Sequence, residues 1–268
     1  MSSTKAEDVL ITIQCDNLKE EEVREWKHFK AWLERLKKNL SLQPDSIESY
    51  KLKSITVEHC TRFGKALGFV KFTALIQNGK GETLSGTIFM RGPSVGMLLI
   101  LQLDDAQGDE GKYVVMTVQP RPAATSMNFV ELPAGMLDND TFKGAAAKEI
   151  KEETSLIIKE EELINMSELA IKATDASDIE EDLPRAMWPS AGGCDEQIQL
   201  FLHEQRISQE ELDKLKGKLT GLRDEGEKIK LKLVKLEDLW WEGARDAKAL
   251  CALALYENLK KAGQLDRV

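Results

Sequence analysis

Apolar side chains recur every three or four residues between residues 17 and 40, with charged side chains between them. These apolar positions are Val23, Trp26, Phe29, Leu33, Leu36 and Leu40. The spacing predicts one amphipathic helix, and its acidic start and lysine-rich end suit the helix dipole. From residue 53 to residue 90 the pattern changes to short β-rich runs punctuated by glycines. These runs predict a small antiparallel sheet beside the helix.

The remaining chain follows the sequence RGPS at 91–94 and mixes strand and helix patterns. Strands are expected at 95–103, 112–119, 129–135, 169–171, 197–203 and 229–234, and helices at 141–156 and 243–261. Because the two patterns do not alternate strictly, they indicate the α+β class with a mixed sheet. We place a domain junction at RGPS. It divides the chain into a β-rich domain with a helix, residues 1–90, and a second domain, residues 91–268.

Composition narrows the class of protein. The chain has 268 residues, 46 of them acidic and 37 basic, and a formal charge of -9. This balance argues against a protein that wraps nucleic acid or one that is held by anionic lipid. The longest apolar run, 95–103, is shorter than the roughly 20 residues that a membrane helix needs. We therefore expect no nucleic-acid partner and no membrane span.

Cysteine usage and the first residues bear on the compartment. The four cysteines are scattered without a CxxC pair, so reduced thiols in a cytosolic compartment are expected. The first residues contain neither an apolar signal-peptide core nor the arginines of a transit peptide. We expect a cytoplasmic protein, or an organellar one if a transit peptide has been trimmed from the sequence.

Three carboxylates share one face of the predicted helix 141–156, because Glu149, Glu152 and Glu153 lie at positions i, i+3 and i+4. Like charges at this spacing repel, and nearby lysines supply only part of the compensating charge. A divalent cation would supply more, and ligands that are all oxygen suit Mg²⁺ or Mn²⁺ better than zinc. The alternative is a solvated acidic helix face, which is common for glutamate pairs.

The sequence around these glutamates, ELPAGMLDNDTFKGAAAKEIKEETSL at 131–156, resembles the Nudix box, G-x5-E-x7-R-E-U-x-E-E-x-G-U with U apolar. The matching positions are Gly135, Lys148, Glu149, Ile150, Glu152, Glu153 and Leu156. The box departs from the pattern at three positions. Asp140 stands where the first glutamate is expected, because the spacing is one residue short, Lys148 replaces arginine, and Ser155 replaces the second glycine.

Three further segments resemble the ADP-ribose and ADP-sugar pyrophosphatases of the Nudix family, and they occur in the same order. They are VQPRPA at 118–123, PSAGGCDEQIQLFL at 189–202 and TGLRDEGEKIKLKLVKLEDLW at 220–240. The likeness is closest to the plant-type ADP-sugar diphosphatases and covers the chain well from residue 91 onward. It covers the N-terminal third only loosely.

The resemblance implies a Nudix α/β/α sandwich with a mixed sheet, preceded by the smaller N-terminal domain. It implies Mg²⁺-dependent hydrolysis, with Mn²⁺ as a possible substitute, of nucleoside diphosphate sugars such as ADP-ribose and ADP-glucose. The products would be AMP and a sugar phosphate. It also implies a homodimer formed with help from the N-terminal region. The alternatives are another Nudix substrate, or a nucleotide-sugar binding protein without catalysis whose box has drifted.

The family's metal ligands fall on Glu149, Glu153 and the carbonyl of Ala134 in this sequence, and Glu153 also counts as a catalytic residue. Glu152 would support the metal cluster or bind it through water. Lys148 would orient the glutamates by pairing with them, although a lysine lacks the planar fork of an arginine. Asp140 has two interpretations, a functional carboxylate or a cap at the start of the helix.

On the late loop, the resemblance makes Glu225 the base that takes a proton from the attacking water, and Glu227 a metal ligand. A base must reach that water within hydrogen-bond distance, which a loop can achieve by closing. The alternative is that both glutamates belong to a solvated surface loop. Arg121 follows a strand and would clamp the diphosphate through bidentate donation. The alternative for Arg121 is an exposed loop arginine.

Substrate contacts are also expected from the PSAGG segment. Gly192 and Gly193 would permit close backbone approach to the ligand, or form an ordinary turn. Glu196 would hydrogen-bond a sugar hydroxyl. For Trp240 and Trp241 we favour packing in the core over adenine stacking, and Trp188 is the better candidate for an aromatic that lines the site.

Overall fold

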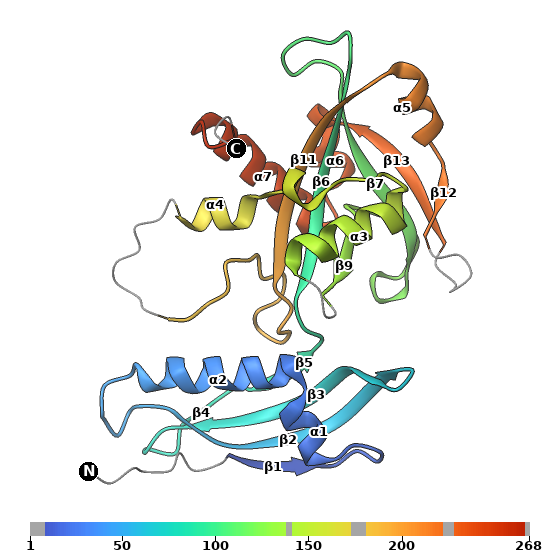
Figure 1. Ribbon diagram of the computed structural model, residues 1–268. Coiled ribbons are helices and arrows are strands. Elements are labelled where there is room, and N and C mark those ends of the chain that lie inside the picture. Colours follow the sequence, from blue (N-terminus) through green and yellow to red (C-terminus); the bar gives the residue numbers. More distant parts are fainter. Residues whose placement is uncertain (1–8, 138–140, 173–180, 222–227, 266–268) are drawn as a thin grey trace. The chain divides into compact units, whose positions relative to one another are not determined.

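The computed structural model describes residues 9–137, 141–172, 181–221 and 228–265. The chain forms two compact units. Among the described residues, the first unit comprises 9–93, 181–184 and 190–196, and the second comprises the others. The division into domains at residues 90 and 91, which was expected from the sequence, stays a prediction. Figure 1 shows the elements of both units.

The first unit is a five-stranded sheet with two helices. Its elements are β1 (Leu10–Ile13), α1 (Glu20–Glu25), α2 (Lys27–Ser41), β2 (Lys51–Phe63), β3 (Ala66–Gln77), β4 (Thr83–Leu84) and β5 (Thr87–Met90). β2 and β3 form a long antiparallel hairpin, and β4 and β5 both pair with β3. The strands β2 to β5 pair antiparallel, as predicted for residues 53–90, and β1, which lies outside that range, runs parallel to β2 and makes the whole sheet mixed.

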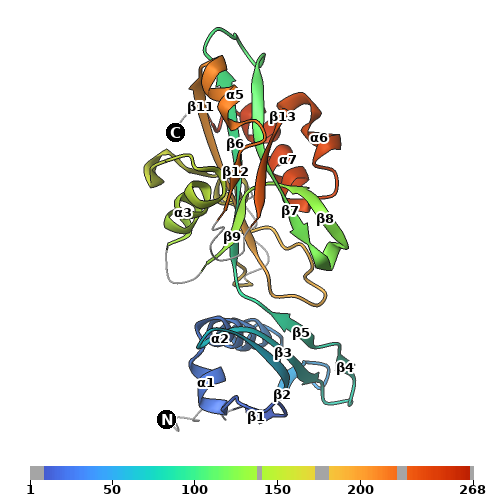
Figure 2. The ribbon, with the colours of Figure 1, turned by 90° about the vertical axis from the view of Figure 1, so that its right-hand side faces the viewer.

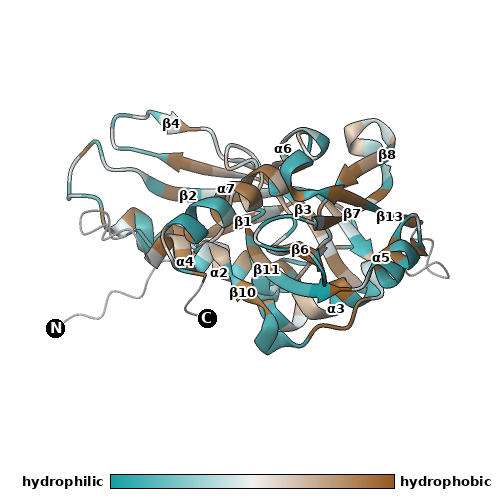
Figure 3. Ribbon diagram, turned by 90° about the horizontal axis from the view of Figure 1, so that it is seen from above, coloured by the Kyte–Doolittle hydropathy of each residue, from teal (hydrophilic) through white to brown (hydrophobic). Residues whose placement is uncertain are grey.

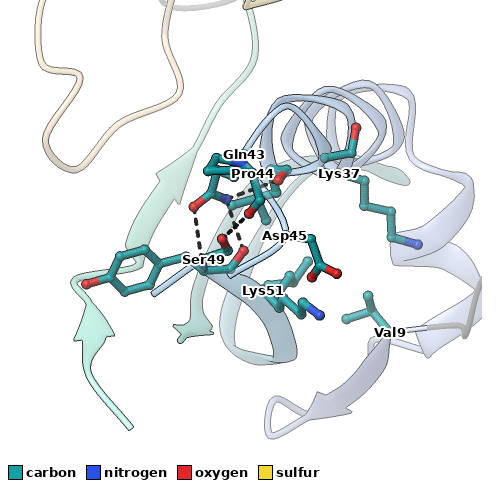
Figure 4. A pocket seen from close by; sticks show the side chains of 11 residues that line it. Val9, Lys37, Gln43, Pro44, Asp45, Ser49 and Lys51 are labelled. Carbon is teal, nitrogen blue, oxygen red and sulfur yellow. Dashed lines mark hydrogen bonds between the residues drawn. The ribbon is translucent and has the colours of Figure 1, made fainter. Parts of the chain in front are cut away.

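The expected single helix over 17–40 is two helices, because Trp26 has an extended backbone (φ -66°, ψ 118°) between α1 and α2. Phe29 of α2 packs against Phe72 of β3, with ring centroids 5.6 Å apart. The first unit therefore has its own core. It also contains a pocket of about 390 Å³ beside the loop that follows α2, shown in Figure 4. The Gln43 side chain, just after α2, accepts from the backbone N–H of Tyr50, just before β2, at 3.0 Å, and so links the two ends of that loop.

The second unit is built on an eight-stranded mixed sheet in the order β10-β11-β6-β7-β13-β12, with β8 on β7 and β9 on β6. Its strands are β6 (Ser94–Leu103), β7 (Lys112–Arg121), β8 (Ser126–Glu131), β9 (Ala134–Met136), β10 (Ile164–Asn165), β11 (Ile198–Ile207), β12 (Leu219–Thr220) and β13 (Ile229–Lys235). β11 and β6 are parallel, and the other pairs are antiparallel. This is the mixed α+β architecture that the sequence predicted.

Helices cover both faces of this sheet, as Figure 2 shows for α3 on one face and α7 on the other. The helices of the second unit are α3 (Phe142–Thr154), α4 (Met166–Lys172), α5 (Gln209–Leu215), α6 (Leu239–Glu242) and α7 (Ala247–Lys261), with short 3-10 turns η1 (Pro122–Ala124), η2 (Glu160–Glu162) and η4 (Leu236–Asp238). Along β6, Leu98 and Ile100 pack in the core beneath α7, while Met97 and Leu99 pack in the core beneath α3. β6 therefore separates two cores. β7 is hydrophobic as well and is brown in Figure 3.

Two sequence expectations for the second unit need correction. The strand expected at 169–171 is part of helix α4, because a short apolar run does not distinguish a strand from a buried helix turn. The C-terminal helix begins at Ala247, later than expected, after the side chain of Asp246 caps it by accepting from the Lys248 N–H. No helix in the described part of the chain is long and apolar enough to cross a membrane.

Candidate active site

The box sequence folds as a strand, a connection and a helix on one face of the sheet. β9 pairs with β6, which places Gly135 opposite Val95. Helix α3 then starts at its N-cap, Thr141, whose side chain accepts from the Gly144 N–H at 3.0 Å. The cap is Thr141, so the capping role considered for Asp140 is taken by its neighbour. Asp140 itself lies outside the described residues.

The end of α3 explains one departure from the box. Ser155 is the C-cap and has a left-handed backbone with φ 63°. That conformation carries no steric penalty for glycine, which is the residue that the Nudix pattern has at this position. Ser155 therefore forms the same turn at the end of the helix. Serine in place of glycine adds backbone strain at this position, but the helix still ends there.

Glu149 lies against the backbone of β9. A Cβ atom added to Gly135 would come within 1.9 Å of the Glu149 Cδ atom, a distance that no side chain can occupy. The glycine of the box is thus required by the close approach of this carboxylate to the strand. The structure brings Glu149 together with Gly135 and, through the next turn of the helix, with Glu153.

Glu153 is almost completely buried, with 5% of its surface exposed. Its Oε2 accepts from the backbone N–H of Ala134 at 3.0 Å, and its Oε1 accepts from the Gln119 amide at 3.4 Å. Burial and the neighbouring charge of Glu149 raise the pKa of Glu153 to about 8, although the Ala134 N–H acts in the opposite direction. Two neighbouring carboxylates, one of them buried, repel each other, and a bound cation would offset that repulsion.

The loop that carries Glu225 and Glu227 lies outside the described residues, but its near end is fixed to α3. The hydroxyl of Thr220 donates to the carbonyl of Glu153, and the N–H of Gly221 donates to the carbonyl of Glu152 at 3.2 Å. The segment containing the two predicted loop glutamates therefore starts beside the helix that carries the box glutamates. Glu152 has a half-buried side chain on that helix.

Arg121 ends β7. Its positive charge acts on Glu153 of α3 and opposes the rise in the pKa of that carboxyl group. Its Nε donates to Glu131 Oε1 at 2.6 Å. Glu131, at the end of β8, also accepts from the Lys248 ammonium at 3.1 Å. Glu131 opens the stretch that resembles the box but was given no role, and neither Gln119 nor Lys248 was identified from the sequence. Gln119 lies two residues before Arg121 on the same strand, within the segment 118–123.

The residues present fit a divalent cation. Glu149 and Glu153 are hard oxygen donors beside β9. Burial, together with the charge of Glu149, raises the pKa of Glu153. Within the described ranges, no group of three or more His, Cys, Asp or Glu side chains is gathered closely enough to hold a metal ion. The two box carboxylates therefore need further ligands, for which the prediction names the Ala134 carbonyl and Glu227.

The predicted residues of the PSAGG segment belong to the first unit, whereas the box helix belongs to the second. Glu196 pairs with Arg91 at 3.5 Å. Added Cβ atoms at Gly192 and Gly193 would meet nothing within 4 Å, so this fold does not itself require glycine at either position. The carbonyl of Gly193 accepts from the Phe89 N–H at 2.8 Å, which attaches the segment to β5.

Other expectations concern single side chains. Lys148 is exposed and, among the described residues, makes no ion pair with the glutamates, so the expected pairing is not formed. Trp240 and Trp241 are 63% and 51% exposed, which contradicts the expectation that they pack in the core. Trp241 lines a cavity of about 730 Å³ together with Phe129 and Arg245. Trp188 is half-buried in the second unit.

Helix α3 carries two neighbouring carboxylates, and the charge of Arg121 at the end of β7 acts on one of them, so these groups are the candidates for binding a divalent cation and an oxyanion. The family model of the NUDIX domain matches residues 90–253. Over 238 residues the chain is 35% identical to Nudix hydrolase 14, chloroplastic, of Arabidopsis thaliana, a match that covers 88% of this chain and 71% of the relative. The chain belongs to the Nudix hydrolase family. It is accordingly a hydrolase of a nucleoside diphosphate derivative, in a family that typically uses a divalent metal.

Proposed function

We propose that the chain hydrolyses the diphosphate bond of nucleoside diphosphate sugars, with ADP-ribose and ADP-glucose as substrates and AMP and a sugar phosphate as products. The observation that carries the proposal is the pairing of Glu149 and Glu153 beside β9, within electrostatic range of Arg121. A diphosphate is anionic and needs positive charge, which Arg121 would supply by direct donation and a cation held by the two carboxylates would supply as well.

In this proposal Glu149, Glu153 and the Ala134 carbonyl hold Mg²⁺, or Mn²⁺ in its place. When bound, the cation supplies Lewis acidity and lowers the pKa of a water ligand. Gln119 and the Ala134 N–H keep the Glu153 carboxylate in one orientation. Arg121 contributes guanidinium donors to the diphosphate, and its contact with Glu131 fixes where those donors lie.

Glu225 is proposed as the base that takes the proton of the attacking water, and Glu227 as an additional metal ligand. Support comes from the near end of their loop, which Thr220 and Gly221 attach to the carbonyls of α3. Glu225 follows Gly221 by only four residues, and an extended chain spans about 3.3–3.6 Å per residue. The base role proposed for Glu225 is compatible with that span.

The remaining assignments are proposals of the same kind. Gly192, Gly193 and Glu196 contact the sugar end of the substrate, the chain divides into domains at residues 90 and 91, and two copies form a homodimer. For the location in the cell, the cytoplasm and an organelle are both retained, and the printed name of the Arabidopsis thaliana relative supports the organelle. Light scattering of the purified chain tests the dimer, because a monomer mass would remove it.

The test of the function is a substrate panel. The full chain is incubated with ADP-ribose, ADP-glucose, a dinucleoside polyphosphate or coenzyme A in the presence of Mg²⁺, and nucleotide release is followed. We expect AMP from the two ADP-sugars at a kcat/KM at least about tenfold above the others, a difference of 1.4 kcal/mol in transition-state binding.

Three controls sharpen the panel. Omission of Mg²⁺ with added EDTA should stop turnover, and Lys232→Met should leave it unchanged, because Lys232 pairs with Glu242 and has no role in the proposed site. Faster release from coenzyme A or a dinucleoside polyphosphate would replace the proposed substrate class. Folded protein that gains thermal stability from ADP-ribose without releasing AMP would make it a binding protein.

A further inference from the structure

Arg121 and Glu131 make fewer hydrogen bonds with each other than their side chains could form. Only Nε of Arg121 donates to Glu131, at 2.6 Å, although the guanidinium has five N–H groups and the carboxylate two oxygens. Such pairs are frequently bidentate, with two parallel hydrogen bonds. Among the described residues, nothing is bonded to Nη1 or Nη2 of Arg121, and its side chain is 43% exposed. A single-point contact in place of a fork needs a cause.

The cause lies in the second carboxylate oxygen of Glu131. Oε2 accepts from the ammonium of Lys248 at 3.1 Å. The side chains of Glu131 and Lys248 are only 6% and 13% exposed, so water competes little for either group. A buried carboxylate must be compensated at both oxygens, and here Lys248 compensates the oxygen that Arg121 would otherwise take.

Lys248 is itself held in place from several directions. Its ammonium pairs with Asp246 at 2.9 Å, and Asp246 accepts from the backbone N–H of Leu132 at 2.8 Å. The two carboxylates raise the pKa of Lys248 although burial lowers it. Its stem passes over Gly96 of β6, where an added Cβ would lie 3.3 Å from the Lys248 Cδ atom. Lys248 belongs to α7, on the face of the sheet opposite α3, as Figure 2 shows.

We infer that Lys248 is a positioning residue for the substrate-binding arginine. By occupying Oε2 of Glu131, it restricts that carboxylate to the Nε of Arg121 and leaves Nη1 and Nη2 for an anionic ligand. The chain Asp246, Lys248, Glu131 and Arg121 alternates in charge and links the start of α7 to the end of β7. The inference rests on the proposed function where it takes that ligand to be the diphosphate of an ADP-sugar.

The first experiment compares Lys248→Met with the wild-type chain, using ADP-ribose and Mg²⁺. Without the ammonium, Oε2 of Glu131 captures a second N–H from Arg121, and the substrate loses that donor. We expect the KM for ADP-ribose to rise about tenfold while kcat stays within about twofold, the signature of lost uniform binding. Lys232→Met is the matched control, since it breaks an ion pair in the same unit that does not involve Glu131 or Arg121, and it should leave KM unchanged.

A double-mutant cycle separates positioning from a general structural effect. Lysine has no fork to be captured, so in an Arg121→Lys background the Lys248→Met change should alter KM by less than about twofold. A residue that only supports the fold would change KM by the same factor in both backgrounds. Equal factors would therefore overturn the inference, as would a wild-type KM in Lys248→Met.

A readout that needs no turnover keeps the inference distinct from the proposed function. The Nε–H signal of Arg121 in an arginine side-chain ¹⁵N spectrum is identified by its loss in Arg121→Lys. It should shift in Lys248→Met and stay in place in Lys232→Met. Should Lys248→Met fail to fold, Lys248→Gln, whose side chain ends one bond earlier, carries the same expectation. Wild-type chain that releases no AMP defeats the proposed function alone, whereas an unshifted signal in a folded Lys248 variant defeats the inference.

Discussion

Glu131 and Glu153 are almost equally buried, with 4% and 5% of their surfaces exposed, yet the two sides of the site surround them with opposite charge. On the β7–β8 side, Glu131 contacts two cations, Arg121 and Lys248. On the α3 side, Glu153 has neutral donors and a second carboxylate, Glu149, which together with burial raises its pKa to about 8. The carboxylate of Glu131 on the β7–β8 side therefore has two cationic partners, whereas the carboxylate of Glu153 on the α3 side is held by neutral donors beside a second carboxylate.

The largest expected effect breaks the α3 side. Glu153→Gln removes a charged ligand, and metal assistance accounts for several kcal/mol of transition-state stabilisation. We expect turnover of ADP-ribose to fall about 1000-fold, which corresponds to roughly 4 kcal/mol. Without metal, the melting temperature should not fall, because the amide is neutral and keeps an acceptor for the Ala134 N–H. Near-normal AMP release would remove Glu153 from the metal set.

The second effect breaks the β7–β8 side and should appear in stability. Glu131→Ala leaves Lys248 with one carboxylate partner in a buried place. Breaking a buried pair by removing one partner costs about 3 kcal/mol, so the free energy of unfolding should fall by about that amount. Urea unfolding measures it, with Glu153→Gln as the contrasting variant. Equal stability of the two variants would contradict the difference between the two sides.

A metal titration sharpens the comparison at a smaller scale. At ten times its dissociation constant, Mg²⁺ should add about 1.4 kcal/mol to the stability of the wild-type chain. The gain should vanish in Glu153→Gln and persist in Glu131→Gln, because the proposed metal ligands lie on the α3 side. Calorimetric unfolding with Mg²⁺ or with EDTA measures the gain. An equal gain in all three proteins would place the metal elsewhere.

The smallest effect concerns the turn that ends α3. Ser155→Gly should raise the free energy of unfolding by about 0.5–1 kcal/mol, because glycine adopts the φ of 63° without the steric cost of a side chain. Ser41→Gly, at the end of α2 in the first unit, is a matched change within a helical backbone and should lower stability by a similar amount. A loss of stability in Ser155→Gly would show that the serine hydroxyl outweighs the strain.

Local patterns predicted the parts of the site that lie close together in sequence. The box glutamates recur at helix spacing, and Gly135 stands at a fixed distance before them, so the motif alone placed the α3 side. Lys248 and Glu131 are 117 residues apart, and their meeting depends on how α7 packs against the sheet. No local periodicity carries that information, which is why the β7–β8 side was missed apart from Arg121.

The errors in the fold have similar causes. Trp26 fits the apolar spacing of one long helix, but its extended backbone divides α1 from α2. Leu169 and Ile171 belong to a run too short to show a period, and they lie in a helix. Trp240 was expected in the core because of its size and apolar ring, whereas it lies exposed on α6. The strands β6 and β7 were predicted with nearly their observed bounds, and the helix α7 was predicted with the end that it has, at Lys261.

The space that Gly135 leaves for Glu149 has a practical consequence. The atoms that a new methyl group would meet are the far end of a flexible side chain, so Gly135→Ala should fold and displace only the Glu149 carboxylate from the strand. Such a variant would keep every acidic residue and the net charge while losing the geometry of the metal site. It offers an inactive protein whose titration behaviour and solubility match the active one, and substrate capture could be studied with it separately from bond cleavage.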